Sequence, residues 1–148
     1  MDEPIYPYKK SLDILTFDFE SIGLNGVSKK KVVYSSIEDL PDIFNLSLFE
    51  VLQDGTLNIY YESRNQDLPQ IMATVVQTMN DFFAKYPSKK IAFTGSTPDR
   101  TRLYRIVINK LIQKNGHVFC IEGITNNGVF EQFQANQNYL AYVISLTK

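Results

Sequence analysis

Residues 94–105 are the part of this 148-residue chain in which residue types and their spacing suggest chemistry. The segment reads Thr-Gly-Ser-Thr-Pro-Asp-Arg-Thr-Arg-Leu-Tyr-Arg, so small hydroxyl residues lead from a short apolar strand into a helix that begins with basic residues. A turn of this kind directs backbone N–H groups and the positive end of the helix dipole towards one spot, which favours a bound anion. The sequence therefore predicts an anion-binding site formed by Thr94, Gly95, Ser96, Thr97, Arg100, Arg102 and Arg105.

Arg100 is the member of this segment that helical periodicity does not explain. On the predicted helix, Arg102 and Arg105 lie on the polar face, whereas Arg100 lies near the centre of the apolar face. A guanidinium at that position needs a carboxylate, carbonyl groups or a bound anion to offset its desolvation. In the alternative reading, the hydroxyl residues only cap the helix and Arg100 pairs with an internal carboxylate such as Asp18 or Glu20.

Catalysis is the weaker interpretation of the same residues. The segment lacks the G-x-x-x-x-G-K-[ST] pattern of a P-loop and the G-x-G-x-x-G pattern of a dinucleotide-binding turn. His117 is the only histidine and Cys120 the only cysteine, which excludes multi-histidine and cysteine-rich metal sites. A triad of Ser96, His117 and an acid has no G-x-S-x-G pattern to support it. We expect no catalytic residues, metal or cofactor, and keep a small enzyme or nucleotide-binding protein using residues 94–105 as the runner-up.

The composition is that of a folded domain of ordinary size. Hydrophobic residues make up 44% and aromatic residues 13% of the chain, which is enough for a packed core, and we expect one domain over residues 1–148. No apolar run approaches the roughly 20 residues that span a bilayer, and the first residues, Met-Asp-Glu-Pro, are acidic. Together with the unpaired thiol of Cys120, these features indicate a cytoplasmic protein without a membrane partner.

Charge is distributed unevenly along the chain, although the formal net charge is only −1. Residues 1–84 carry six basic and 13 acidic side chains, whereas residues 85–114 carry eight basic side chains and one acidic one. A local excess of cations attracts anions, although a fold that interleaves the two parts would cancel this field. The charge pattern therefore favours a non-enzymatic binding module for an anionic ligand.

Single-stranded nucleic acid is the polyanion that best suits a basic helix beside an aromatic-rich sheet. Proteins that bind it combine a charged groove with aromatic side chains on which bases stack. Tyr34, Tyr60 and Tyr61 fall on predicted strands and are candidates for such stacking. Sheet aromatics more often pack in a core, and a chain without net positive charge is unusual for a dedicated binder. Three alternatives to single-stranded nucleic acid stay open: a small phosphate-containing ligand, a role as a protein–protein interaction module, and assembly into a homo-oligomer.

Four strands in a row are predicted for the first part of the chain. Apolar and polar residues alternate over residues 12–20, which is the period of two that marks a half-buried strand. The pairs Asn25-Gly26 and Asp54-Gly55 tolerate positive φ and predict hairpin turns. The other three strands are expected over residues 29–35, 43–51 and 56–62.

The period changes at Asp67, where Asp67 and Gln70 have the spacing of a capping box. Apolar residues then recur at helical spacing until Pro87, which predicts a long amphipathic helix. A second helix is predicted within residues 98–114, and the remaining strands are predicted over residues 90–95, 117–123, 129–133 and 139–146. The expected fold class is α+β: an antiparallel four-strand meander, a helix, then strand-helix-strand-strand-strand, with the sheet packed by two helices.

Three stretches of the sequence carry a resemblance to a known family. They are the pattern TGSTxxRTRLY at residues 94–104, the turn Ile22-Gly23-x-x-Gly26 followed by Lys29 and Lys31, and the tail Phe130-Glu131-x-Phe133 with Asn138-Tyr139-x-Ala141-Tyr142-Val143. On these residues the chain resembles a family of short, uncharacterised proteins found mainly in Bacteroidetes-type bacteria, a domain of unknown function. The resemblance covers nearly the whole chain and implies no activity, so it carries over no catalytic residue.

The order of elements gives a second, coarser resemblance. A four-strand meander followed by a helix is similar to half of the Whirly and Pur-alpha type single-strand binders, whereas the second half of this chain departs from their repeat.

Overall fold

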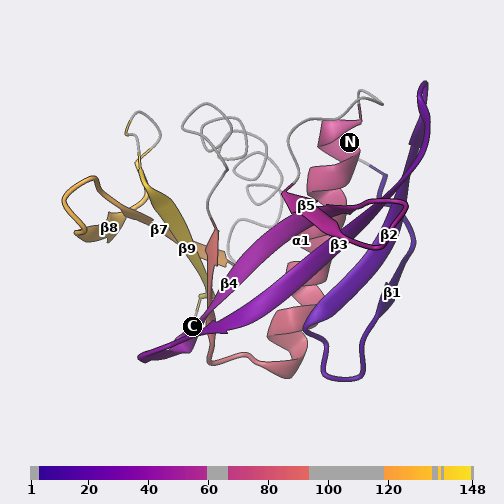
Figure 1. Cartoon of the computed structure of the whole chain (residues 1–148). Helices are drawn as coiled ribbons and strands as arrows, with labels where there is room; N and C mark the ends of the chain where they lie inside the picture. Colours follow the sequence, from indigo (N-terminus) through magenta and orange to yellow (C-terminus); the bar gives the residue numbers. More distant parts are fainter. Residues whose placement is uncertain (1–3, 60–66, 94–118, 135–136, 138, 148) are drawn as a thin grey trace.

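The computed structural model describes residues 4–59, 67–93, 119–134, 137 and 139–147. Among these residues, the strands form one sheet and a single helix accompanies it (Figure 1). In chain order the elements are β1 (Tyr8–Lys10), β2 (Thr16–Gly23), β3 (Gly26–Ile37), β4 (Leu40–Val51), β5 (Leu57–Ile59), α1 (Leu68–Lys85), β6 (Lys90–Phe93), β7 (Phe119–Ile124), β8 (Phe130–Gln132) and β9 (Ala141–Leu146).

The first four strands form an antiparallel meander, and β5 pairs with the end of β4. The hairpin predicted at Asn25-Gly26 is confirmed, because β2 and β3 join there and Gly26 has a φ of 95°. Phe17 and Phe19 of β2 are buried, while Asp18 between them is exposed, as the period of two predicts. Local alternation thus assigns the two faces of this strand correctly.

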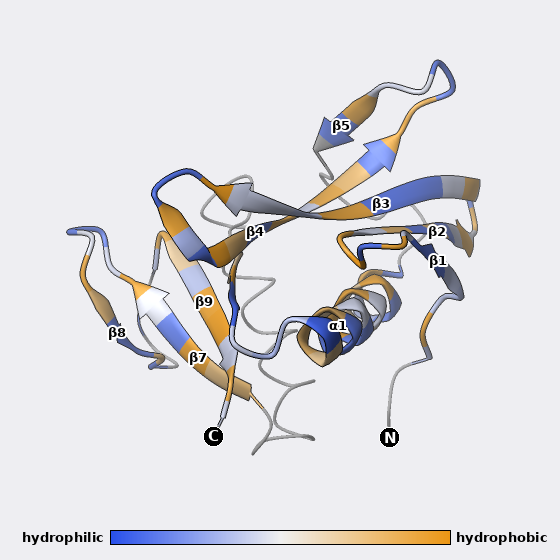
Figure 2. Cartoon of the chain, turned by 90° about the horizontal axis from the view of Figure 1, so that it is seen from below, coloured by the Kyte–Doolittle hydropathy of each residue, from blue (hydrophilic) through white to orange (hydrophobic). Residues whose placement is uncertain are grey.

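The helix α1 lies across one face of this meander, which we call the inner face; the opposite face is the outer face (Figure 2). Tyr34 of β3 stacks on Phe82 of α1 with ring centroids 4.7 Å apart. The long helix predicted between Asp67 and Pro87 is therefore confirmed, with the bounds Leu68–Lys85. Its buried side chains recur three or four residues apart and include Ile71, Met72, Val75, Met79 and Phe82.

A second group of strands extends the sheet beyond β4. The strand β6 pairs with β4 in the parallel direction, with Phe44 opposite Ile91. The strand β9 then pairs with β6 and with β7, antiparallel to both, and β8 forms the far edge. A parallel neighbour requires a crossover connection, which here includes α1. The sheet is therefore mixed.

The predicted fold class, an antiparallel sheet packed by two helices, is wrong. The sheet has nine strands in mixed directions, and α1 is the only helix in the described ranges. The second helix was predicted within residues 98–114, which lie outside the described residues. A period of two gives the faces of a strand but not the direction of its neighbour, so the parallel pair left no local signal. The strand β1 was missed because three residues are too few for alternation to show.

A helix with the length and apolar character needed to cross a membrane is absent from the described residues.

Candidate ligand-binding groove

The seven residues predicted to bind an anion lie outside the described residues, so their site stays a prediction. The two carboxylates considered as alternative partners of Arg100 are described. Asp18 Oδ1 lies 3.4 Å from Lys31 Nζ, and Glu20 is exposed on the outer face. Asp18 is therefore already engaged by a lysine of the neighbouring strand. The predicted residues are Thr94, Gly95, Ser96, Thr97, Arg100, Arg102 and Arg105.

A groove with a volume of about 630 Å³ lies on the outer face of β1, β2 and β3, and we call it the outer groove. Charged side chains from all three strands line it. The lining also includes Lys30, whose ammonium is on the inner face. The outward-facing charged side chains are three lysines and two carboxylates, which leaves a net positive charge on the walls of the groove. These side chains are Lys9 of β1, Asp18 and Glu20 of β2, and Lys29 and Lys31 of β3.

Strand register explains why these charges meet. Lys9 lies opposite Asp18, and Asp18 lies opposite Lys31, so the three residues form one row across the strands. Glu20 and Lys29 lie opposite each other in the next outward-facing row. Among the described residues, Asp18 and Lys31 form an ion pair, whereas Lys9 and Lys29 form none. The outer groove therefore presents two ammonium groups that no carboxylate of the described strands holds.

The hairpin end of the outer groove is apolar. Ile22 lines the groove and lies opposite Val27, and each is 60% exposed. Val51, which also lines the groove, lies opposite both Lys29 and Leu57. Leu57 is 43% exposed. Neighbouring aliphatic side chains left in water are typical of binding surfaces.

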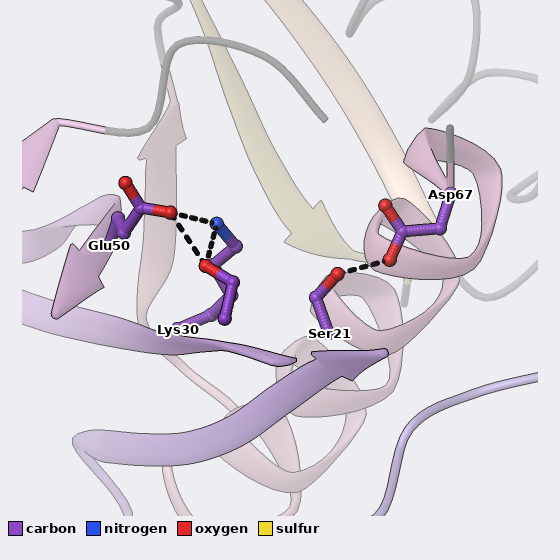
Figure 3. Close-up of polar contacts among 5 residues, drawn as sticks. Ser21, Lys30, Glu50 and Asp67 are labelled. Atoms are coloured by element: carbon purple, nitrogen blue, oxygen red, sulfur yellow. Dashed lines mark hydrogen bonds and ion pairs between the residues drawn. The ribbon is translucent and has the colours of Figure 1, made fainter. Parts of the chain in front are cut away.

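Lys30 lies between two lysines of the outer groove in sequence, yet its side chain is on the inner face (Figure 3). Only 4% of that side chain is exposed. Its Nζ donates hydrogen bonds to Ser28 Oγ and to Glu50 Oε1, each at 2.9 Å. The Ser28 hydroxyl donates to the same Oε1 at 2.6 Å. The carboxylate offsets the desolvation of the buried ammonium.

A second polar contact fastens the start of α1 to the inner face. Asp67 Oδ2 accepts hydrogen bonds from the hydroxyls of Tyr6 and Ser21, each at 2.5 Å (Figure 3 shows the Ser21 contact). The capping box predicted for Asp67 is wrong, because its carboxylate makes no side-chain cap hydrogen bond and binds these hydroxyls instead. Burial, and secondly the hydrogen bond to Asp67, raise the pKa of the Tyr6 phenol.

The inner-face contacts join neighbouring elements of the fold. The ammonium of Lys30 and the hydroxyl of Ser28 both donate to Glu50, which links β3 to β4. Within the described ranges, no group of three His, Cys, Asp or Glu residues could hold a metal ion. Lys30 was not among the residues predicted from the sequence, although one signal marks it: it occupies an inward position in line with Val32 and Tyr34.

Tyr34, a predicted stacking platform, does not face a ligand. It is 2% exposed on the inner face, and its hydroxyl lies 2.8 Å from Thr78 Oγ1 of α1. Tyr60 and Tyr61, the other two candidates, lie outside the described residues. The prediction of base stacking on Tyr34 is therefore wrong, because the strand period places this ring in the core.

The described residues define an α/β protein in which a helix lies on one face of a mixed sheet and a lysine-lined groove lies on the other. The chain matches the model of a family of unknown function (DUF6934) over residues 2–147, and it belongs to that family. A search of curated proteins and a search of solved structures each found no significant match. Two expectations stay predictions: that the family occurs mainly in Bacteroidetes-type bacteria, and that the TGSTxxRTRLY pattern identifies its members.

Proposed function

We propose that this protein is a non-enzymatic binding module for an anionic ligand. The observation that carries the proposal is the outer groove, which has a volume of about 630 Å³. Its walls carry three outward-facing lysines, Lys9, Lys29 and Lys31, beside two carboxylates. Lysine ammonium groups each offer three hydrogen-bond donors to an anion. The proposal keeps the sequence-based expectation of a bacterial, cytoplasmic protein.

The size and lining of the outer groove favour binding over chemistry. Ligand-binding pockets typically enclose about 300–1,000 Å³, and this groove falls within that range. Serine, threonine, cysteine and histidine are absent from its described lining, so that lining offers no serine, threonine or cysteine nucleophile paired with a histidine base. Charge complementarity is then the main source of affinity that the groove supplies.

Residues 94–105 are proposed as a second contact for the same kind of ligand. The hydroxyl groups of this segment can donate hydrogen bonds to a phosphate, and its arginines can neutralise the charge of that phosphate. Single-stranded nucleic acid is the polyanion that tests the proposal first, because each phosphate contact makes affinity fall with salt.

Salt-dependent binding of a labelled oligodeoxythymidine, followed by fluorescence anisotropy, tests the proposal. We expect binding at low salt that weakens as salt rises, with a logarithmic slope of about −0.7 for each phosphate contacted. The variant Lys9→Glu/Lys29→Glu should lose at least tenfold in affinity. Its control, Lys85→Glu/Lys89→Glu, makes the same change in net charge at the C-terminal end of α1 and beyond it, away from the groove.

The same experiment contains the results that would contradict the proposal. If the oligonucleotide does not bind and inorganic phosphate does not raise the melting temperature, the protein is not an anion-binding module. If the control lowers affinity as much as Lys9→Glu/Lys29→Glu, the effect reflects net charge and not the groove. If only Arg100→Ala abolishes binding, the ligand uses the predicted segment alone and the groove is rejected.

A further inference from the structure

We infer that the outer groove takes an amphiphilic anion, a monomeric molecule with a carboxylate or phosphate head and an aliphatic chain. This inference rests on the proposed function and specifies its ligand class. The observation behind it is the juxtaposition, on one sheet face, of exposed aliphatic side chains with two lysines that form no ion pair within the described part of the chain.

The lysines supply the site for the head group. Lys9 and Lys29 come from the first and third of three adjacent strands, and neither forms an ion pair among the described residues. Lys29 is one outward-facing row beyond Lys9 along the strands. With strands about 4.8 Å apart and a rise of about 3.4 Å per residue, their Cα atoms are roughly 12 Å apart, a span that two flexible lysine side chains can close over one anion. Lys31 is held by Asp18 and adds positive charge at the edge of this site.

The aliphatic side chains supply the surface for the chain of the ligand. Ile22 and Val51 line the groove at its hairpin end, and the neighbouring Val27 is 60% exposed. Leu24, in the turn of the same hairpin, is 80% exposed. An aliphatic chain that starts at the lysines and runs towards the hairpin would remove these side chains from water, which is favourable for each methylene buried.

The lining argues against a nucleic acid as the preferred ligand. Bases bind by stacking on aromatic faces, but the tyrosine rings of the lining are turned inward. Tyr6 is 5% exposed and donates its hydroxyl to Asp67, and Tyr8 donates its hydroxyl to Asp81 of α1. The exposed apolar surface of the described groove is aliphatic, which suits an alkyl chain better than a base.

The charges of the groove also argue for a single molecule rather than a lipid surface. Asp18 and Glu20 are exposed on the same face as the lysines, where they would repel a layer of anionic head groups. Asp18 and Glu20 lie on β2 between the strands of Lys9 and Lys29, so a single anion is held by ammonium groups that reach over β2, where Asp18 is already paired with Lys31. The volume of about 630 Å³ is that of one small ligand.

Calorimetric titration of the full chain with hexanoate, octanoate and decanoate, each below its micelle concentration, tests this inference. Affinity should rise about two- to fourfold for each added methylene, the range expected for half to full burial of that group. Acetate should bind weakly, and octyl glucoside, which has a similar chain and a neutral head, should bind at least tenfold more weakly than octanoate.

Two variants separate the head site from the chain site. Lys9→Glu/Lys29→Glu should weaken all three carboxylates together, whereas Ile22→Ser/Val27→Ser should abolish the dependence on chain length. Both aliphatic side chains are exposed, so their loss should leave the melting temperature nearly unchanged. The control Val129→Ser/Leu140→Ser removes two exposed aliphatic side chains outside the groove and should change nothing.

The possible results distinguish this inference from the proposed function. Salt-dependent oligonucleotide binding without any chain-length effect would overturn the inference and leave the proposed function standing. Binding to phosphatidylglycerol vesicles but not to monomeric carboxylates would also overturn it, in favour of a lipid surface. Failure of every anion to bind would overturn both.

Discussion

The Nζ atom of Lys30 lies 2.9 Å from the Oε1 atom of Glu50, its direct cross-strand partner on β4. The two side chains differ greatly in exposure, because Lys30 is 4% exposed and Glu50 is 41% exposed. The lysine therefore bears most of the desolvation cost of the pair, whereas the carboxylate keeps access to water. Replacing the lysine and replacing the carboxylate should therefore lower the free energy of unfolding by different amounts.

The first prediction concerns this asymmetry. Glu50→Gln should lower the free energy of unfolding by about 1–3 kcal/mol, because a neutral amide replaces the carboxylate that the buried ammonium contacts. Lys30→Met should change stability by less than about 1 kcal/mol, because an apolar chain of similar length replaces the buried charge and the Glu50 side chain is 41% exposed. Urea denaturation of both variants measures the difference. Equal losses of stability in the two variants would contradict the prediction, because they would show that the Glu50 carboxylate depends on the lysine as much as the lysine depends on it.

The second prediction concerns the buried phenol of Tyr34. Burial raises the pKa of Tyr34 above its ordinary value of about 10. Above pH 10 the unfolded chain loses a phenolic proton that the folded protein keeps, so stability falls as pH rises towards the folded pKa. Below pH 10 both states keep the proton and this contribution is fully present.

Tyr34→Phe isolates that contribution. Near pH 7 the variant should be about 1 kcal/mol less stable than the original protein, because the hydrogen bond to Thr78 is lost. Between about pH 10 and pH 11 its stability should fall more slowly, by up to about 1.4 kcal/mol per pH unit, so the two curves should converge. Urea denaturation at a series of pH values gives the stability of each protein as a function of pH. Parallel curves would show that Tyr34 does not have a raised pKa in the folded protein.

The third prediction concerns the packing of Tyr139 on Gly123. A Cβ atom added to Gly123 of β7 would overlap the ring of Tyr139. That ring also packs against Tyr142 with centroids 5.7 Å apart, which limits its freedom to move away. Gly123→Ala should therefore destabilise the protein by about 1–3 kcal/mol in thermal or urea denaturation.

A double-mutant cycle checks the cause of that loss. In a Tyr139→Ala background the ring is gone, so Gly123→Ala should cost at least 1 kcal/mol less than in the original protein, roughly the coupling seen for residues in contact. Full additivity of the two substitutions would show that the ring is not what excludes the methyl group.

Elements with a strong local period were predictable from the sequence. The helix α1 follows from apolar residues at helical spacing before Pro87, and the hairpin between β2 and β3 follows from Asn25-Gly26. Strand ends were less predictable: β3 spans Gly26–Ile37, whereas alternation indicated residues 29–35. Backbone pairing continues past the last alternating side chain, so the pattern underestimates strand length.

The candidate site was not predictable from the same signals. Lysines 29–31 are three identical neighbours in sequence, and only strand register shows that two face the outer groove and one faces Glu50. Lys9 joins them from β1, an element too short to be recognised. The site predicted at residues 94–105 lies outside the described residues and stays a prediction.

By itself, the sequence determined the helix α1, the first hairpin and the alternation of faces along β2, because these depend on backbone geometry within a few residues. The tertiary structure decided which strands are neighbours: β6 parallel to β4, Lys9 in one row with Asp18 and Lys31, and Lys30 opposite Glu50. Those neighbours are chosen by contacts between distant parts of the chain, where packing on α1 outweighs any local preference. The groove between Lys9 and Lys29 exists only through that choice.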